Sequence, residues 1–286
     1  MGVFMQFGDF FLVNTEQFII NAFAHASRHI GDDGAVVGEW VYSQDAFFED
    51  VHFKRAWLTP YQIGYKAAIV NLSDAIAMHA RPRYALLTLA LPKAMRHSEI
   101  GALIEGIQAA CKAHNCEMIG GDTIANASIA LSMTIIAQTT KPLYRHTARK
   151  GEMLFYTGHL GQSQKTLRTL QNGGRASSIG RFVRPQLRSA FVERAYRVLG
   201  AGMDISDGLL TDAQKLCASS GVGYRLLGTI DAHVACSGEE YEILGSCAPR
   251  NKKALIRRAR VSRTTVTFFA KTTRNRPKER CKAHHF

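Results

Sequence analysis

Residues 66–78 constrain the fold of this chain more than any other segment. Nine of these thirteen residues are apolar and occupy almost every face of a helix, which is typical of a helix buried against a sheet. Asp74 lies within this apolar segment. An ionised carboxylate removed from water is costly unless a cation or a metal compensates its charge. Asp74 is therefore either a cap or core ion pair, the usual case for an isolated acid, or one part of a functional site.

Further acids support the functional interpretation, because they stand beside Gly, Ser or Thr at the edges of apolar segments. They are Asp32, Asp33, Asp45, Asp122, Asp204 and Asp207. Carboxylates without thiolate or paired His ligands favour Mg²⁺, and the glycines at 120–121 let the backbone approach a ligand closely. This combination suggests Mg²⁺ with a nucleoside triphosphate, and hence phosphoryl transfer. Taken singly the motifs are weak, since Asp32-Asp33-Gly34 is also an ordinary turn and His52 an ordinary packed His.

The chain of 286 residues is long enough for two domains, and the apolar pattern restarts near Lys150. Apolar periodicity predicts helices over 14–30, from Thr59-Pro60 onward, over 98–114 with Ser98 as cap, and over 186–199. Strands are predicted over 40–43, 84–91, 129–137 and 153–157. A domain boundary between residues 148 and 149 follows from this pattern.

Charge, cysteines and hydropathy restrict the cellular setting. No run of about 18 apolar residues occurs, and residues 1–13 lack the features of a signal peptide, so neither a membrane span nor export is expected. The six cysteines have no metal-type spacing, which predicts reduced thiols in a cytoplasm.

The formal net charge of +13 is concentrated at one end of the chain. Residues 250–286 carry +12, and residues 1–249 carry only +1. This basic tail is interpreted as a solvated face or as an attraction for a phosphorylated small molecule, and RNA or DNA binding is the minority interpretation.

Six ordered motifs resemble those of the thiamine-monophosphate kinase family over nearly the whole chain. They are IGDD at 30–33, VHF at 51–53 after Asp45, KAAIVNLSD at 66–74, IGGDT at 119–123, MDISDGL at 203–209 and GEEYEI at 238–243. The first, third and fourth are similar to motifs of the wider aminoimidazole ribonucleotide synthetase superfamily. The VHF and GEEYEI motifs point to the thiamine enzymes themselves.

The resemblance implies ATP-dependent phosphorylation of thiamine monophosphate to thiamine diphosphate, by direct in-line γ-phosphoryl transfer with several Mg²⁺ ions. The implied fold is α/β, with two domains that each contain a mixed sheet flanked by helices. Residues 1–148 would bind ATP and Mg²⁺ and form a homodimer by pairing N-terminal sheets, and residues 149–286 would close the site. A cytoplasmic enzyme without membrane or nucleic-acid partners is expected.

The resemblance also assigns roles residue by residue. The implied metal ligands are Asp33, Ser43, Asp45, Asp74, Asp122, Asp204 and Asp207. The implied ATP contacts are Gly121, Asp122, Arg145 and Ser206. His52 and Glu239 would hold thiamine monophosphate, and Asp74, Asp122 and Asp207 would be the catalytic acids.

Four positions depart from the family pattern. Gln44 replaces a Thr, Ser237 replaces a Gly, Glu240 replaces an Asp, and Ala283 stands where an aromatic ring would stack on the substrate. These departures keep two alternatives open. One is a related enzyme with another phosphate or carboxylate acceptor; the other is a binding protein whose basic tail engages RNA or an acidic partner.

Overall fold

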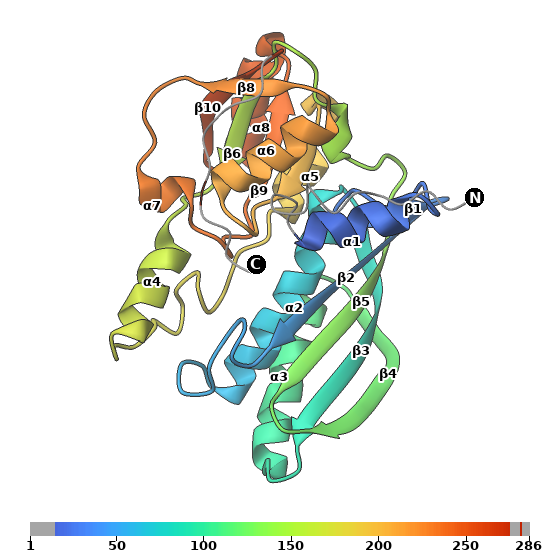
Figure 1. The fold of residues 1–286 in the computed structure, drawn as a ribbon, viewed down its shortest axis with the longest axis vertical. Helices are drawn as coiled ribbons and strands as arrows, with labels where there is room; N and C mark the ends of the chain where they lie inside the picture. The colour runs from blue at the N-terminus through green and yellow to red at the C-terminus, as the bar shows by residue number, and fades with distance from the viewer. Residues whose placement is uncertain (1–14, 275–280, 282–286) are drawn as a thin grey trace, which may run out of the picture.

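Two five-stranded sheets form the core of the protein, whose computed structural model describes residues 15–274 and 281. They form two lobes (Figure 1). The first sheet has the order β1 (Ala35–Val37), β2 (Trp40–Phe48), β5 (Ala130–Gln138), β3 (Arg81–Pro92) and β4 (Glu117–Asn126). The second has the order β7 (Gly202–Asp204), β9 (Ile243–Cys247), β6 (Met153–Thr157), β10 (Val266–Thr273) and β8 (Gly223–Leu226).

The predicted α/β class is confirmed, but only the first sheet is mixed. Its β3–β4 pair is parallel, whereas every other pair in the two sheets is antiparallel. Because α3 (His97–Ala113) connects β3 to β4, those two strands can run side by side in the same direction. The strands of the second sheet are joined so that neighbours alternate in direction.

The first sheet is covered by helices on one face only. The helix α2 (Pro60–Ala77) packs with α3 against this face (Figure 1), and 13 of its 18 residues are buried. It begins as predicted, with the Thr59 hydroxyl accepting from the Gln62 N–H and the Gln62 side chain accepting from the Thr59 N–H. The opposite face carries large exposed apolar side chains. They are Tyr42, Phe48, Tyr84 and Leu86.

The second sheet is covered on both faces. One face packs against α6 (Leu209–Ser219), and the other packs against α5 (Ser189–Ala195) and α8 (Lys252–Val261). Ala77 at the end of α2 belongs to the latter core cluster, so α2 contacts both halves of the molecule. The remaining helices are α1 (Thr15–Ala24), α4 (Gln162–Gln171) and α7 (Ala232–Ala235).

Several predicted boundaries are wrong in detail. The helix α3 begins at His97, and Ser98 is not its cap; instead the Glu99 carboxylate accepts from the backbone N–H of Arg96. The strand predicted over 40–43 continues to Phe48 because it pairs with β5 over nine residues. The helix predicted over 186–199 is shortened to α5 and a 3₁₀ turn, Tyr196–Val198.

The cysteines do not all follow the prediction of reduced thiols. Cys236 and Cys281 form a disulfide, whereas Cys111, Cys116, Cys217 and Cys247 are free and buried. The two bonded cysteines are 45 residues apart, and only the fold brings them together. No helix among the described residues is both long and apolar enough to cross a bilayer. Ala283 and most of the basic tail beyond Arg274 lie outside the described residues.

Two glycines allow α2 and α3 to approach closely. A Cβ atom added at Gly64 would lie 2.0 Å from the Leu103 carbonyl oxygen, and one at Gly106 would lie 2.0 Å from the Tyr61 carbonyl oxygen. Neither carbonyl can move without displacing its helix. Gly101 is also in α3, yet a Cβ atom there would have no neighbour within 4 Å.

We therefore expect Gly106→Ala to lower the free energy of unfolding by about 2 kcal/mol or more, through overpacking. The matched variant Gly101→Ala should raise it by about 0.5–1 kcal/mol, because alanine is the better helix former. Urea unfolding followed by circular dichroism measures both. Equal stability of the two variants would contradict the close packing of α2 against α3.

Candidate active site

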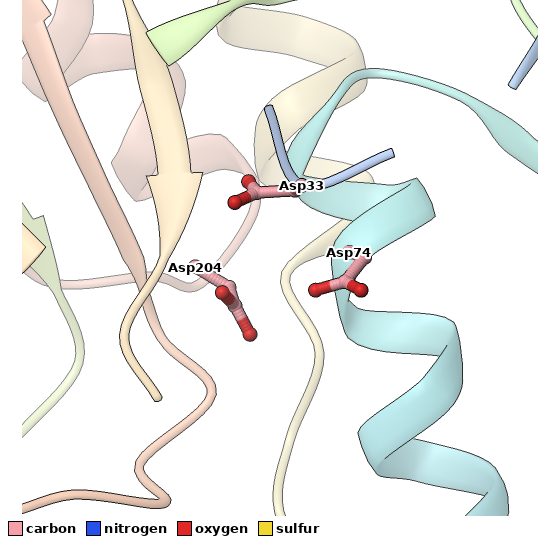
Figure 2. A group of neighbouring side chains, drawn as sticks. All are labelled: Asp33, Asp74 and Asp204. Atoms are coloured by element: carbon pink, nitrogen blue, oxygen red, sulfur yellow. The ribbon is translucent and has the colours of Figure 1, made fainter. Parts of the chain in front are cut away.

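Three carboxylates from different parts of the chain meet between the two sheets. Asp33 lies in the turn before β1, Asp74 on α2 and Asp204 at the end of β7 (Figure 2). One oxygen of each lies within 4.8 Å of the oxygens of the other two. Figure 2 shows the three side chains directed toward a common space. The structure thus brings together three of the predicted metal ligands.

Local contacts fix the orientation of these acids. The Ser73 hydroxyl donates to Asp204 Oδ2 at 2.7 Å, and it connects α2 with β7. The Arg145 guanidinium pairs with Asp33, and its Nε lies 3.7 Å from Asp32 Oδ1. The backbone N–H of Arg145 also donates to Asp32. Arg145, predicted to contact ATP, therefore lies against the acid cluster.

Burial and mutual repulsion raise the pKa values of this cluster. Burial is the largest cause of the raised pKa of Asp74, and the neighbouring Asp45, Asp204 and Asp33 raise it further, to well above its usual value. Burial and then Asp33 raise the pKa of Asp204 to about 8, although the Ser73 hydroxyl lowers it. The pKa of Asp33 is raised by burial, against the lowering effect of Arg145.

Asp45 and Ser43 extend the cluster along β2. The Asn71 side chain joins this strand to α2, because its Oδ1 accepts from the Asp45 N–H at 2.9 Å. The Ser43 hydroxyl is buried and donates to the Asn71 carbonyl oxygen at 3.5 Å. Burial, followed by Asp33 and Asp207, raises the pKa of Asp45 to about 6. Both predicted ligands therefore border the same group of acids.

Asp207 lies on the loop between β7 and α6 and pairs with Lys215. Asp212, which the sequence analysis did not single out, holds this loop in place. Its buried Oδ2 accepts from the backbone N–H groups of Ser206, Asp207 and Gly208, at 3.0–3.1 Å. Asp212 is an acid in the first turn of α6, where the helix dipole favours negative charge, and this signal could have indicated a role at the start of the helix.

A cavity of about 580 Å³ adjoins the loop at Ser206. It is lined by His52 and Glu239, the two predicted substrate residues, and by Trp57 and Phe182. His52 Nδ1 accepts from the Phe48 N–H at 3.0 Å, and the His52 ring packs against Phe47 with centroids 5.5 Å apart. The cavity therefore combines polar side chains with apolar and aromatic walls, as small-molecule sites do.

Asp122 is the exception among the predicted ligands, because it lies away from the cluster. Asp122 is on β4, and Asp45 is on β2. In the strand order, β4 lies three strand spacings from β2, about 14 Å. Asp122 pairs with Thr88, whose side chain faces away from the helices, whereas Asp45 lies on the α2 side of the sheet. All ten residues of β4 are exposed. Within one chain, Asp122 does not reach the other acids.

The donor set of the cluster fits Mg²⁺. Its ligand atoms are carboxylate oxygens, which hard divalent cations prefer. Within the part of the chain that the structure describes, Asp33 Oδ2 is buried without a hydrogen-bond partner. A divalent cation among these oxygens would offset the repulsion that raises their pKa values. Ser73 and Asn71 would orient the ligands; both lie within the motif at 66–74, but their contacts depend on the fold.

Known proteins are similar to this chain over most of its length. Residues 31–139 match the family described as AIR synthase related protein, N-terminal domain. The chain is 34% identical over 211 residues to the thiamine-monophosphate kinase of Aquifex aeolicus, covering 70% of this chain and 69% of that protein. The Bacillus subtilis thiamine-monophosphate kinase is 33% identical over 216 residues, 69% of this chain and 66% of that protein. The solved structure of AaThiL complexed with AMPPCP and TMP matches with a TM-score of 0.81 at 26% identity, covering 93% of this chain and 94% of that chain.

The raised carboxylate pKa values predict an unusual pH dependence for the metal-free protein. The pKa of Asp204 is about 8 in the folded protein against an ordinary 3.8, so the folded state holds a proton that the unfolded state releases. The stabilisation from this group is complete below pH about 4 and is lost as the pH rises toward about 8. Urea midpoints measured in EDTA should therefore fall across this window.

In Asp204→Asn this pH dependence should be weaker, because the titrating group is gone. Added Mg²⁺ should raise the wild-type midpoint at pH about 8 and have little effect on the variant. The prediction fails if the wild type and the variant give the same slope and the same response to Mg²⁺.

Proposed function

Because the chain belongs to the thiamine-monophosphate kinase family, we propose that it transfers the γ-phosphoryl group of ATP to thiamine monophosphate, with thiamine diphosphate and ADP as products. One observation carries the proposal beyond the family relationship: the cavity of His52 and Glu239 is also lined by Ser206, which follows Asp204 of the acid cluster by two residues. A metal-binding phosphate site next to an acceptor pocket is what phosphoryl transfer between two bound substrates requires.

The proposed mechanism depends on positioning and charge. When bound, Mg²⁺ would neutralise the phosphate oxygens, and Asp33, Asp45, Asp74, Asp204 and Asp207, together with Ser43, would hold it. Arg145 would direct its guanidinium toward phosphate oxygens as well as toward Asp33. No general base is needed, because a phosphate oxygen of thiamine monophosphate is already ionised at neutral pH. His52 and Glu239 would orient the acceptor for in-line attack.

We propose that the enzyme acts as a homodimer in which Asp122 and Gly121 complete the site of the partner subunit. Two features of the first sheet support this. Its edge strand β4 is exposed along its whole length and carries the apolar residues Met118, Ile119 and Ile124, and its uncovered face is also apolar. An exposed apolar edge strand is a surface that natural proteins normally cover. A second copy would cover it and would bring an acid that cannot reach its own cluster.

The division into domains 1–148 and 149–286 and the cytoplasmic location remain part of this proposal. Each part would contain one of the two sheets. In a reducing cytoplasm, the bond between Cys236 and Cys281 would be exposed to thiol exchange.

The test of the activity is incubation of the purified protein with Mg²⁺, ATP and thiamine monophosphate, followed by separation of the thiamine species. We expect thiamine diphosphate and ADP in equal amounts, and none without Mg²⁺. Asp74→Asn should lower the rate by about 100-fold or more, because it removes a charge that holds the metal. The control Asp231→Asn changes an exposed acid at the start of α7 and should retain the rate. A folded wild-type protein that binds ATP but forms no thiamine diphosphate would refute the proposed acceptor.

The contribution of Asp122 across the dimer can be tested by complementation. Asp74→Asn and Asp122→Asn should each be inactive as homodimers. A heterodimer of the two variants, isolated with two affinity tags, has one site with both defects and one with neither, provided that Asp122 acts in the partner's site. It should therefore regain about half the wild-type activity. If Asp122 acts within its own chain, each site of the heterodimer keeps one defect and no activity returns.

A further inference from the structure

Lys66 is a buried cation to which neither the motifs nor the acid cluster gives a role. Its side chain is 0% exposed and lies on α2, eight residues before Asp74. Burying an ammonium group is costly unless it is paired. Its Nζ lies 2.7 Å from Glu239 Oε2, and this is its one carboxylate partner among the described residues. The centroid of the Phe182 ring lies 3.9 Å from the same nitrogen, and the centroid of the Phe47 ring lies 5.8 Å from it.

Glu239, the partner of Lys66, lies on a loop with an unfavourable backbone conformation. Glu239 and Tyr241 have positive φ values of 55° and 51°, which are unfavourable for residues other than Gly. The Glu239 N–H donates to the Ser206 carbonyl and the Tyr241 N–H to the Ile205 carbonyl, and these bonds hold the loop against the residues directly after β7. The Ser163 hydroxyl donates to the Glu239 carbonyl at 2.9 Å. Lys66 is the contact that ties the Glu239 side chain itself to the first half of the chain.

The two oxygens of the Glu239 carboxylate have different surroundings. Oε2 is occupied by Lys66, whereas Oε1 has no hydrogen-bond partner among residues 15–274 and 281. The side chain is 21% exposed and lines the 580 Å³ cavity with His52. The contact with Lys66 therefore holds this carboxylate beside the cavity at a fixed place relative to α2.

We propose that Lys66 is a positioning residue for the acceptor: it holds Glu239 so that Oε1 receives a cationic or N–H-bearing ring of the acceptor. The inference rests on the proposed function for the identity of the acceptor, thiamine monophosphate, which has a positively charged ring and an amino group. Since Lys66 and Asp74 lie on one rigid helix about 12 Å apart along its axis, the same element sets both the acceptor anchor and the metal site. Lys66 acts only through Glu239 and does not touch the reacting phosphates.

The kinetic test compares Lys66→Met, Glu239→Gln and the double variant. Lys66→Met should raise the KM for thiamine monophosphate about 10-fold, with little change in kcat and in the KM for ATP. In the Glu239→Gln background, adding Lys66→Met should change little, because the carboxylate that Lys66 holds is already gone. Lys66→Arg, which keeps the charge, should recover part of the lost affinity. Additive effects of the two substitutions, or equal effects on both substrates, would overturn the proposal.

A second readout needs no substrate and separates this inference from the proposed activity. Hydrogen exchange of the amides of Glu239 and Tyr241 should become at least about 10-fold faster in Lys66→Met, while amides in the middle of α3 keep their wild-type rates. Should Lys66→Met alone unfold, the double variant with Glu239→Gln removes both charges and allows the same comparison. Unchanged exchange in this loop would overturn the positioning role even if the enzyme makes thiamine diphosphate. Faster exchange in a protein that makes none would refute the activity and leave the loop anchor intact.

Discussion

The repulsion among the carboxylates of Asp33, Asp74 and Asp204 is the constraint on which the rest of the structure depends. Three acids within 4.8 Å of one another and largely removed from water raise one another's pKa values, so their proximity opposes folding. The apolar cores of the two sheets must offset this cost, and Arg145 and Ser73 reduce it locally. An arrangement so unfavourable without a cation is typical of a binding site and not of a structural core.

The helix α2 contacts both the acid cluster and the residues of the cavity. It carries Asp74 directly, orients Asp204 through Ser73 and supports β2 at Asp45 through Asn71. Lys66 adds the contact to Glu239 on the cavity side. The close packing of α2 against α3, with Gly64 and Gly106 at the contact, limits its movement. Burial of nearly every face of α2 therefore has a functional reason, because a helix fixed on all sides can hold several distant groups in register.

Much of this arrangement follows from the sequence, but the pairings do not. The apolar run at 66–78 predicts a buried helix, and the Asp residues beside Gly and Ser predict an oxygen-ligand site, because both depend on local composition. The contact of Lys66 with Glu239 joins residues 173 positions apart, and the disulfide of Cys236 with Cys281 likewise depends on the tertiary fold. The sequence does not indicate the full length of β2, because its pairing with β5, and not its own composition, extends it to Phe48.

Asp122 illustrates a different limit of sequence analysis. The family resemblance groups it with Asp74 and Asp204 as metal ligands, which implies one shared site. The sheet order β1-β2-β5-β3-β4 instead places it on the edge opposite β1 and β2, with its side chain on the uncovered face. A motif identifies the kind of site to which a residue belongs, but it does not identify which copy of the chain supplies that residue. The exposed, apolar edge and face around Asp122 supply the physical argument for the proposed dimer, because natural proteins rarely leave a surface of this kind uncovered.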